Sequence, residues 1–437
     1  MKKKKINTNK IRVNKIVFVF VFFLFAIFIV RLSYLCLIDY KVGDTTITAF
    51  IKNRNVEEEI IMPKRGTIYD KNGNILAQDV ASYTVIAYLD KSRSENSSTL
   101  NHVEDIENTA DKLSEVLDID KDTLIEYLSK DLYQVELGPN AKNLSQLKME
   151  EVKALNLPGI DFIKSTKRYY PNGDFASYML GYTVLKEDND GNNFITGELG
   201  VEEYFNDILK GETGYVTYEK DRYGYKIANG REYKKEAKDG EDVYLTIDNN
   251  IQLFIENAVK KASSNSLAEW VLMIVADAKT GAILGYSNTP SFDPNERNLT
   301  SYLDPVVNNA YEPGSTMKIF SYMCAIETGN YNGSDTYTSG SKTYTSDVTG
   351  EEVTISDWNK EGWGNLTYDQ GFALSSNIAV ANMINNFISI NDLHACYQKY
   401  GFGSTTGFTL KRELTGSIDF TYEIEAATAG YGQGITT

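Results

Sequence analysis

Serine and lysine are the residues of this chain best suited to covalent chemistry, because its 437 residues include only two histidines, His102 and His394. A serine nucleophile that lacks a histidine needs another base, and a lysine amine is the usual alternative. Ser-x-x-Lys spacing puts both side chains on one face of a helix, within reach of a hydrogen bond. The pattern occurs at Ser145–Lys148, Ser315–Lys318 and Ser339–Lys342. The sequence therefore points to nucleophilic catalysis by a serine with a lysine as its base.

Sequence context separates the three copies. Charged residues follow Ser145–Lys148, which predicts an exposed helix, and Ser339–Lys342 lies in a Tyr-, Thr- and Ser-rich run that reads as loop or strand. Ser315 follows a Glu-Pro-Gly turn and begins a helix that ends near Gly329. The N-terminus of a helix favours an alkoxide or oxyanion, and burial among apolar residues lowers the pKa of a lysine such as Lys318. The alternative is a helix-capping serine beside a surface lysine.

The elements that must position this pair lie in residues 243–437, where one hairpin and many helices predict an α+β domain. Asp248 is expected to cap the first helix of this part, and two strands with a tight turn between them are expected within 271–286. Residues 39–242 instead alternate short strands with Gly-marked turns, and two amphipathic helices are predicted within 105–130. We therefore expect a separate α+β domain before residue 243.

The N-terminus predicts a single membrane anchor. Residues 16–38 are almost wholly apolar, and as a helix they extend about 34 Å, enough for a bilayer core of roughly 30 Å. Residues 1–15 carry seven basic and no acidic side chains, which holds that end in the cytoplasm and places the remainder outside the cell membrane. The alternative is a cleaved signal peptide, but no small-residue cleavage site follows the apolar stretch.

Composition excludes several other functions. With 44 basic and 60 acidic residues the net charge is −16, which disfavours nucleic-acid binding. Two histidines are too few for most His-rich metal sites, and three cysteines cannot form a disulfide framework. Cys324 is expected to be a small core residue. His394 and Cys396 are close in sequence, but nothing orients them as a Cys-His nucleophile.

The segment around Ser315 and Lys318 resembles the penicillin-recognising serine transpeptidases. Further segments are similar to the monofunctional, class B branch of the penicillin-binding proteins, of the division and sporulation type: Pro63–Asp70, Arg168–Gly173, Gly197–Glu202, Thr280–Leu284, Pro290–Asn295 and Gly432–Gly434. The resemblance runs in the family's order from about residue 12 to the last residue. It implies an elongated α+β pedestal of the dimerisation type at 39–242, then a transpeptidase fold with helices around an antiparallel sheet at 243–437.

The family's second motif, Ser-x-Asn, is matched by Ser375-Ser376-Asn377, which opens an apolar helix after the nucleophile. The resemblance implies that Ser375 relays a proton between Lys318 and the leaving amine, and that the Asn377 amide holds Lys318 or the substrate backbone. Ser376 and the segment Gly432-Gln433-Gly434 are expected to bind substrate. Ser389–Asn391, another copy, is expected to be an ordinary helix cap.

The family's third motif, Lys-Thr/Ser-Gly, should follow on a strand, but the only such triplet, Lys279-Thr280-Gly281, precedes Ser315 in the predicted hairpin turn. We therefore expect a transpeptidase domain that is incomplete at its C-terminus and a chain that is inactive as written. Its remaining strands would have exposed edges.

The resemblance implies a peptidoglycan D,D-transpeptidase that cross-links stem peptides through a Ser315 acyl-enzyme, is acylated by β-lactams and needs neither metal nor organic cofactor. The expected partners are the membrane, a separate membrane glycan polymerase, and division or elongation proteins. Two alternatives remain: a β-lactamase or β-lactam sensor with the same chemistry, and a catalytically incomplete cell-wall scaffold.

Overall fold

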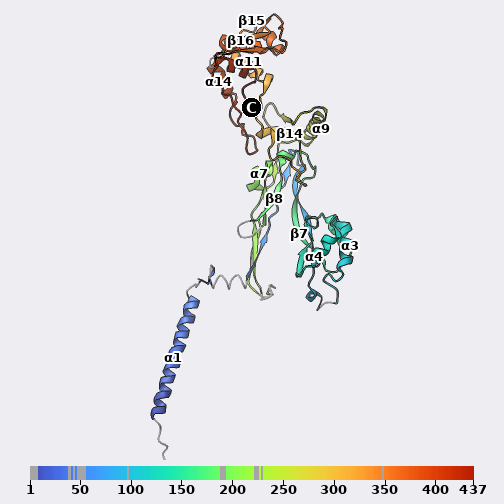
Figure 1. The fold of residues 1–437 in the computed structure, drawn as a ribbon, viewed down its shortest axis with the longest axis vertical. Helices are drawn as coiled ribbons and strands as arrows, with labels where there is room; N and C mark the ends of the chain where they lie inside the picture. The colour runs from blue at the N-terminus through green and yellow to red at the C-terminus, as the bar shows by residue number, and fades with distance from the viewer. Residues whose placement is uncertain are drawn as a thin grey trace, which may run out of the picture. The chain divides into compact units, whose positions relative to one another are not determined.

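The computed structural model describes residues 8–37, 41–42, 45–46, 56–95, 98–187, 193–220, 226–227, 230–346 and 349–437. The chain divides into two compact units (Figure 1). One unit comprises residues 1–63 and 212–239, and the other comprises residues 64–211 and 240–437. Each unit is described by itself.

The first unit contains the apolar helix α1 (Thr8–Leu37). Its segment Lys15–Tyr34 has a mean hydropathy of 2.8 and no buried side chains, and it is the one described helix long and apolar enough to cross a membrane. The helix agrees with the predicted span at 16–38, of which Ile38 lies outside the described residues. It also extends N-terminally into the predicted basic arm.

The other regular elements described in the first unit are antiparallel strands. Strand β10 (Gly214–Glu219) lies between β3 (Val56–Ile61) and β11 (Glu232–Lys235). A separate two-stranded hairpin pairs β1 (Lys41–Val42) with β2 (Thr45–Thr46).

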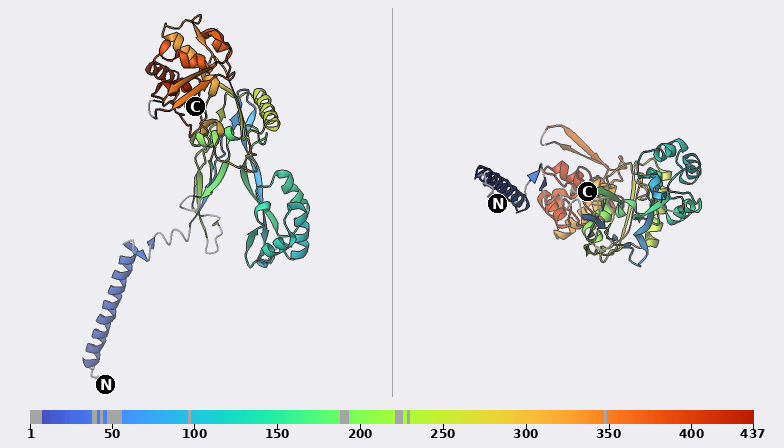
Figure 2. Two further views of the ribbon diagram at one scale, coloured as in Figure 1. Left: turned by 45° about the horizontal axis from the view of Figure 1, so that its top comes forward. Right: turned by 90° about the horizontal axis from the view of Figure 1, so that it is seen from below.

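The second unit begins with a five-stranded sheet built on the long strand β5 (Ile75–Tyr88). Its other strands are β4 (Ile68–Tyr69), β6 (Gln134–Glu136), β7 (Ile160–Tyr169) and β12 (Val243–Tyr244). Helices α3 (Ile106–Leu117), α4 (Lys121–Leu128) and α5 (Gln146–Ala154) lie beside β5 and β7 (Figure 2). Two of these helices are the predicted amphipathic pair, and their apolar faces, with Leu113 and Leu124 fully buried, confirm that prediction.

A network of buried ion pairs connects this sheet to α7 (Gly200–Tyr204), a short helix later in the chain. The Glu202 carboxylate in α7 accepts from Arg65 Nε at 2.6 Å and from Arg168 Nε at 2.6 Å. Arg168 Nη1 also lies 3.2 Å from Asp79 Oδ1. Breaking one partner of such a network leaves an uncompensated buried charge, so it holds these elements in one arrangement. The remaining elements of this part are η1 (Lys91–Ser94), η2 (Pro139–Ala141), α6 (Ser177–Leu180), β8 (Thr183–Glu187), β9 (Asn193–Gly197) and α8 (Asn206–Leu209).

The last part of the second unit is α+β, as predicted. Asp248 caps α9 (Asn249–Asn265) by accepting from the N–H groups of Asn250 and Ile251, and β13 (Val271–Ala276) pairs antiparallel with β14 (Ile283–Thr289). The elements that follow are α10 (Pro305–Asn308), η3 (Gly314–Met317), α11 (Lys318–Glu327), β15 (Thr336–Thr338), β16 (Ser341–Thr345), β17 (Glu352–Ser356), β18 (Asn365–Thr367), α12 (Tyr368–Ala373), α13 (Asn377–Asn386), α14 (Ile390–Lys399) and α15 (Glu423–Gly430).

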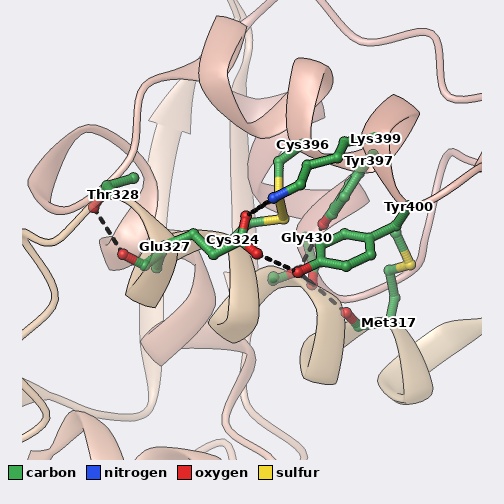
Figure 3. The surroundings of a disulfide bond; sticks show 11 residues. Met317, Cys324, Glu327, Thr328, Cys396, Tyr397, Lys399, Tyr400 and Gly430 are labelled. Atoms are coloured by element: carbon green, nitrogen blue, oxygen red, sulfur yellow. Dashed lines mark hydrogen bonds and ion pairs between the residues drawn. A yellow bond between two sulfur atoms is a disulfide. The ribbon is translucent and has the colours of Figure 1, made fainter.

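A disulfide joins two of these helices, which the sequence analysis did not foresee. Cys324 in α11 and Cys396 in α14 are bonded with their Cα atoms 5.9 Å apart (Figure 3). Cys324 is buried, as expected of a core residue, but it is not a free thiol. The pairing was missed because the two cysteines are 72 residues apart and meet only when α11 packs against α14.

Removing this disulfide is expected to destabilise the helical core. Closing a loop of this length typically stabilises a fold by about 2–4 kcal/mol. We therefore expect the Cys324→Ser/Cys396→Ser variant to unfold at a lower denaturant concentration than the wild type. The measurement is chemical denaturation in the absence and presence of a dithiol reductant. Reductant should shift the wild type towards the variant and leave the variant unchanged; coincident curves for all samples would contradict the assignment.

Candidate active site

The predicted nucleophile lies in a short 3₁₀ segment that leads directly into a helix. Ser315 belongs to η3, and Lys318 is the first residue of α11. The Ser315 side chain is exposed, whereas Lys318 is only 3% exposed. Among the described residues the Ser315 hydroxyl has no hydrogen-bond partner, so it is free to meet a ligand. The structure thus gives this Ser-x-x-Lys copy an exposed serine and a buried amine, and the described contacts include no hydrogen bond between the two side chains.

The segment Gly432-Gln433-Gly434 lies directly against this turn. The Gly314 N–H donates to the Gly432 carbonyl at 2.9 Å, and the Gly434 N–H donates to the Glu312 carboxylate at 2.8 Å. Gly432 has φ +83°, and a Cβ there would come within 2.1 Å of the Gly314 oxygen. A side chain at position 432 would therefore displace the nucleophile turn. Gln433 is exposed and remains a candidate for substrate contact.

Lys318 contacts the second predicted motif. Its Nζ lies 2.6 Å from the Ser375 carbonyl oxygen and 3.1 Å from Ser375 Oγ. Burial lowers the pKa of Lys318 to about 8, and the negative charge of Asp357 opposes this shift. An amine with this pKa is a competent proton acceptor near neutral pH. The adjacent Ser375 hydroxyl can pass that proton onward.

Backbone conformation and capping set the position of Ser375. Its φ of +56° is unusual for a residue with a side chain, and such conformations persist only where the surroundings enforce them. Ser376 is the N-cap of α13 and accepts from the Ala379 N–H at 2.9 Å. The Asn377 Nδ2 donates to the Ser356 carbonyl at 2.9 Å. The Asn377 amide was expected to hold Lys318 or the substrate backbone, but its described contacts include no hydrogen bond to Lys318.

Ser376 requires a correction to the sequence-based expectation. It is 1% exposed, and its hydroxyl donates to Asp357 Oδ1 at 2.8 Å. A side chain so enclosed does not reach a substrate, so we assign Ser376 to holding the turn. The sequence pattern could not distinguish which of the two adjacent serines points inward.

Asp357, which the sequence analysis missed, is a buried residue beside this motif. It is 2% exposed and follows β17. An isolated aspartate after a short strand carries no recognisable signal. In the folded protein, Gly340, Ser376 and Ile378 surround its carboxylate and donate hydrogen bonds to it.

The other motif copies are structural, as predicted. Ser145 caps the exposed helix α5, and Lys148 pairs with Glu151 at 2.9 Å. Ser389 caps α14. Lys279-Thr280-Gly281 forms the β13–β14 turn, which Asp277 stabilises through two backbone N–H groups.

The helix carrying Lys318 is fixed to its neighbours close to the site. Ser321 Oγ lies 2.6 Å from Tyr397 Oη and 2.5 Å from the Gly430 carbonyl oxygen. One turn further along, the disulfide joins α11 to α14, and Glu327 accepts from Lys399 and Tyr400 at 2.6 Å each (Figure 3). This scaffold leaves α11 little freedom to move, so Lys318 is preorganised.

Comparison with known families identifies two regions of the chain. Residues 60–245 match the penicillin-binding protein dimerisation domain, and residues 271–437 match the penicillin-binding protein transpeptidase domain. The second region contains Ser315, Lys318 and Ser375.

Individual relatives agree with these matches. The chain is 29% identical over 425 residues to stage V sporulation protein D of Bacillus subtilis, covering 94% of this chain and 61% of that protein. It is 27% identical over 420 residues to the peptidoglycan D,D-transpeptidase MrdA of Escherichia coli, covering 86% and 63%. The crystal structure of penicillin-binding protein 2X from Streptococcus thermophilus superposes with a TM-score of 0.67 at 30% identity, covering 87% and 57%. The chain thus spans about three fifths of the length of these relatives.

Proposed function

Because this chain belongs to the class B penicillin-binding proteins, we propose that the protein is a serine-type peptidoglycan D,D-transpeptidase in which Ser315 forms the acyl-enzyme. The observation that carries the proposal is the contact of Ser375 with the buried amine of Lys318, which lies three residues along the chain from the exposed Ser315. The proposed base, proton relay and nucleophile all belong to the region that matches the transpeptidase domain.

The proposed reaction has two acyl-transfer steps. Lys318 accepts the Ser315 hydroxyl proton while Ser315 Oγ attacks the carbonyl of the D-Ala-D-Ala peptide bond of a stem peptide. The bond to the terminal D-alanine breaks, and Ser375 passes a proton to that leaving amine. An amine of a neighbouring stem peptide then attacks the ester and gives a proton to the Lys318–Ser375 pair, which passes it to the departing Ser315 Oγ and so regenerates the serine hydroxyl. The products are a cross-linked peptide and D-alanine.

β-Lactams are proposed to acylate the same serine, because their strained amide presents an equivalent carbonyl. The ring-opened product remains attached to Ser315, since its leaving amine is not released. A long-lived adduct distinguishes a transpeptidase from a β-lactamase, which would hydrolyse it rapidly.

The proposed setting is the outer face of the cell membrane. Helix α1 would be the anchor, with the basic residues 1–15 on the cytoplasmic side. The region matching the dimerisation domain would then position the site above the membrane. A separate membrane glycan polymerase would supply the glycan strands that carry the stem peptides. Division or elongation proteins would recruit the enzyme.

A reconstituted cross-linking reaction tests this function. The full-length gene product in detergent is incubated with uncross-linked glycan strands that carry pentapeptide stems, and the digested products are analysed by liquid chromatography and mass spectrometry. We expect cross-linked dimers and free D-alanine, both abolished by prior exposure to penicillin. A folded protein that gives neither product and no penicillin adduct would support the scaffold alternative.

A further inference from the structure

Three consecutive residues, the last of β17 and the two that follow it, hold the turn containing Ser375 by hydrogen bonds. The Ser356 carbonyl accepts from Asn377 Nδ2 at 2.9 Å, and Trp358 Nε1 donates to the Leu374 carbonyl at 3.1 Å. Between them, Asp357 accepts from both Ser376 Oγ and the Ile378 N–H. The turn is thus held on both sides of Ser375 by one short strip, Ser356–Trp358.

Asp357 is the centre of this strip. Its Oδ1 accepts from Ser376 Oγ at 2.8 Å and from the Ile378 N–H at 3.0 Å. Its Oδ2 accepts from the Gly340 N–H at 2.9 Å, and its own N–H donates to the Gly340 carbonyl at 2.8 Å. A buried carboxylate is costly unless several donors satisfy it, and here three donors do so. The side chain therefore has one strongly preferred position.

We propose that Asp357 is a positioning residue that holds Ser375 against Lys318 Nζ, so that proton relay in the transpeptidase reaction depends on it. This inference rests on the proposed function and adds a residue that touches neither substrate nor nucleophile. Ser375 is held at φ +56° with both its carbonyl and its hydroxyl towards Lys318. Asp357 fixes Ser376 and Ile378, the first and third residues after Ser375, and thereby maintains that conformation.

The charge of Asp357 also acts on Lys318. Of the charged residues described, Asp357 is the one whose charge raises the pKa of Lys318 against the larger lowering caused by burial. Loss of this charge, with the turn otherwise in place, lowers the pKa of Lys318 further. The pH dependence of acylation then moves to lower pH, which loss of stability alone does not produce.

The test compares Asp357→Asn with Asp304→Asn in the full-length protein. Asp304 is a matched control because it is also 2% exposed and caps a helix, α10, by accepting from the Val306 N–H at 3.1 Å. Acylation by a fluorescent penicillin is followed from pH 6 to 10 and normalised to the folded fraction. Misplacement of a catalytic group by about 1 Å costs on the order of 10²-fold in rate. We expect such a decrease for Asp357→Asn, with a midpoint at lower pH, and neither change for Asp304→Asn.

Two further measurements do not depend on activity. Hydrogen exchange of peptides spanning 375–379 should accelerate in Asp357→Asn, because the amide has one acceptor oxygen in place of two and cannot accept from the Gly340 N–H and from the Ser376 and Ile378 donors together. Lys318 should also react faster with an amine-specific acylating reagent, located by mass spectrometry. If the wild type is not acylated by penicillin, the proposed function fails while these two readouts still report on Asp357. Unchanged exchange and Lys318 reactivity, or a normalised acylation rate within about twofold of wild type, would overturn the proposal.

Discussion

Replacing Ser315 by alanine is expected to abolish covalent labelling of the full-length protein by fluorescent penicillin. Ser315 is exposed, and in the proposed mechanism its hydroxyl is the one group that forms the ester. Because the side chain is exposed, its truncation should leave the thermal unfolding temperature nearly unchanged. The measurement is in-gel fluorescence with a parallel unfolding curve.

Ser145→Ala is the matched control, since Ser145 begins another Ser-x-x-Lys copy. It caps α5 by accepting from the Lys148 N–H at 3.2 Å, so its loss costs about 1 kcal/mol of stability. Labelling of this variant should equal that of the wild type. Persistent labelling of Ser315→Ala would show that a different residue is the nucleophile.

Replacing Lys318 by methionine is expected to lower the acylation rate by a factor on the order of 10²–10⁴, the range found when a general base is removed. Methionine has a similar length and no charge, so it fits the buried position without an unpaired ammonium group. The variant should therefore be at least as stable as the wild type. Lys148→Met, which removes only a surface ion pair with Glu151, should acylate normally. A Lys318→Met protein that is acylated at the wild-type rate would exclude Lys318 as the base.

The pH dependence of acylation provides a second readout of Lys318. The amine accepts a proton only when it is neutral, and burial lowers its pKa to about 8. About a tenth of the molecules therefore have a neutral Lys318 at pH 7 and about nine tenths at pH 9. The rate should rise across this interval and then level off in the wild type, and the rise should disappear in Lys318→Met.

Local features of the site were predictable from the sequence. The helical segment that carries Ser315 and Lys318 was predicted from local sequence, and η3 and α11 confirm it. Ser375 was selected because its motif opens an apolar helix, and α13 with Ile378 and Met383 buried confirms that helix. The α+β fold and the β13–β14 hairpin followed in the same way from short-range periodicity.

Features that depend on long-range packing were not predictable. Asp357 lies between residues 340 and 376, and no pattern in a single sequence indicates that these surround one carboxylate. The Cys324–Cys396 bond requires α11 to pack against α14, and the burial of Ser376 requires Asp357 behind it. For Asp357, the two cysteines and Ser376, contacts with residues distant in the sequence determine the structural role.

The most direct test of the account is to trap the acyl-enzyme and locate it. The full-length protein is incubated with a thioester analogue of the D-Ala-D-Ala stem peptide, quenched in acid, digested and analysed by tandem mass spectrometry. The account predicts one acyl group on the peptide that contains Ser315, and its loss when an acceptor amine is added. An acyl group on Ser375 or elsewhere, or none on a folded protein, would contradict it.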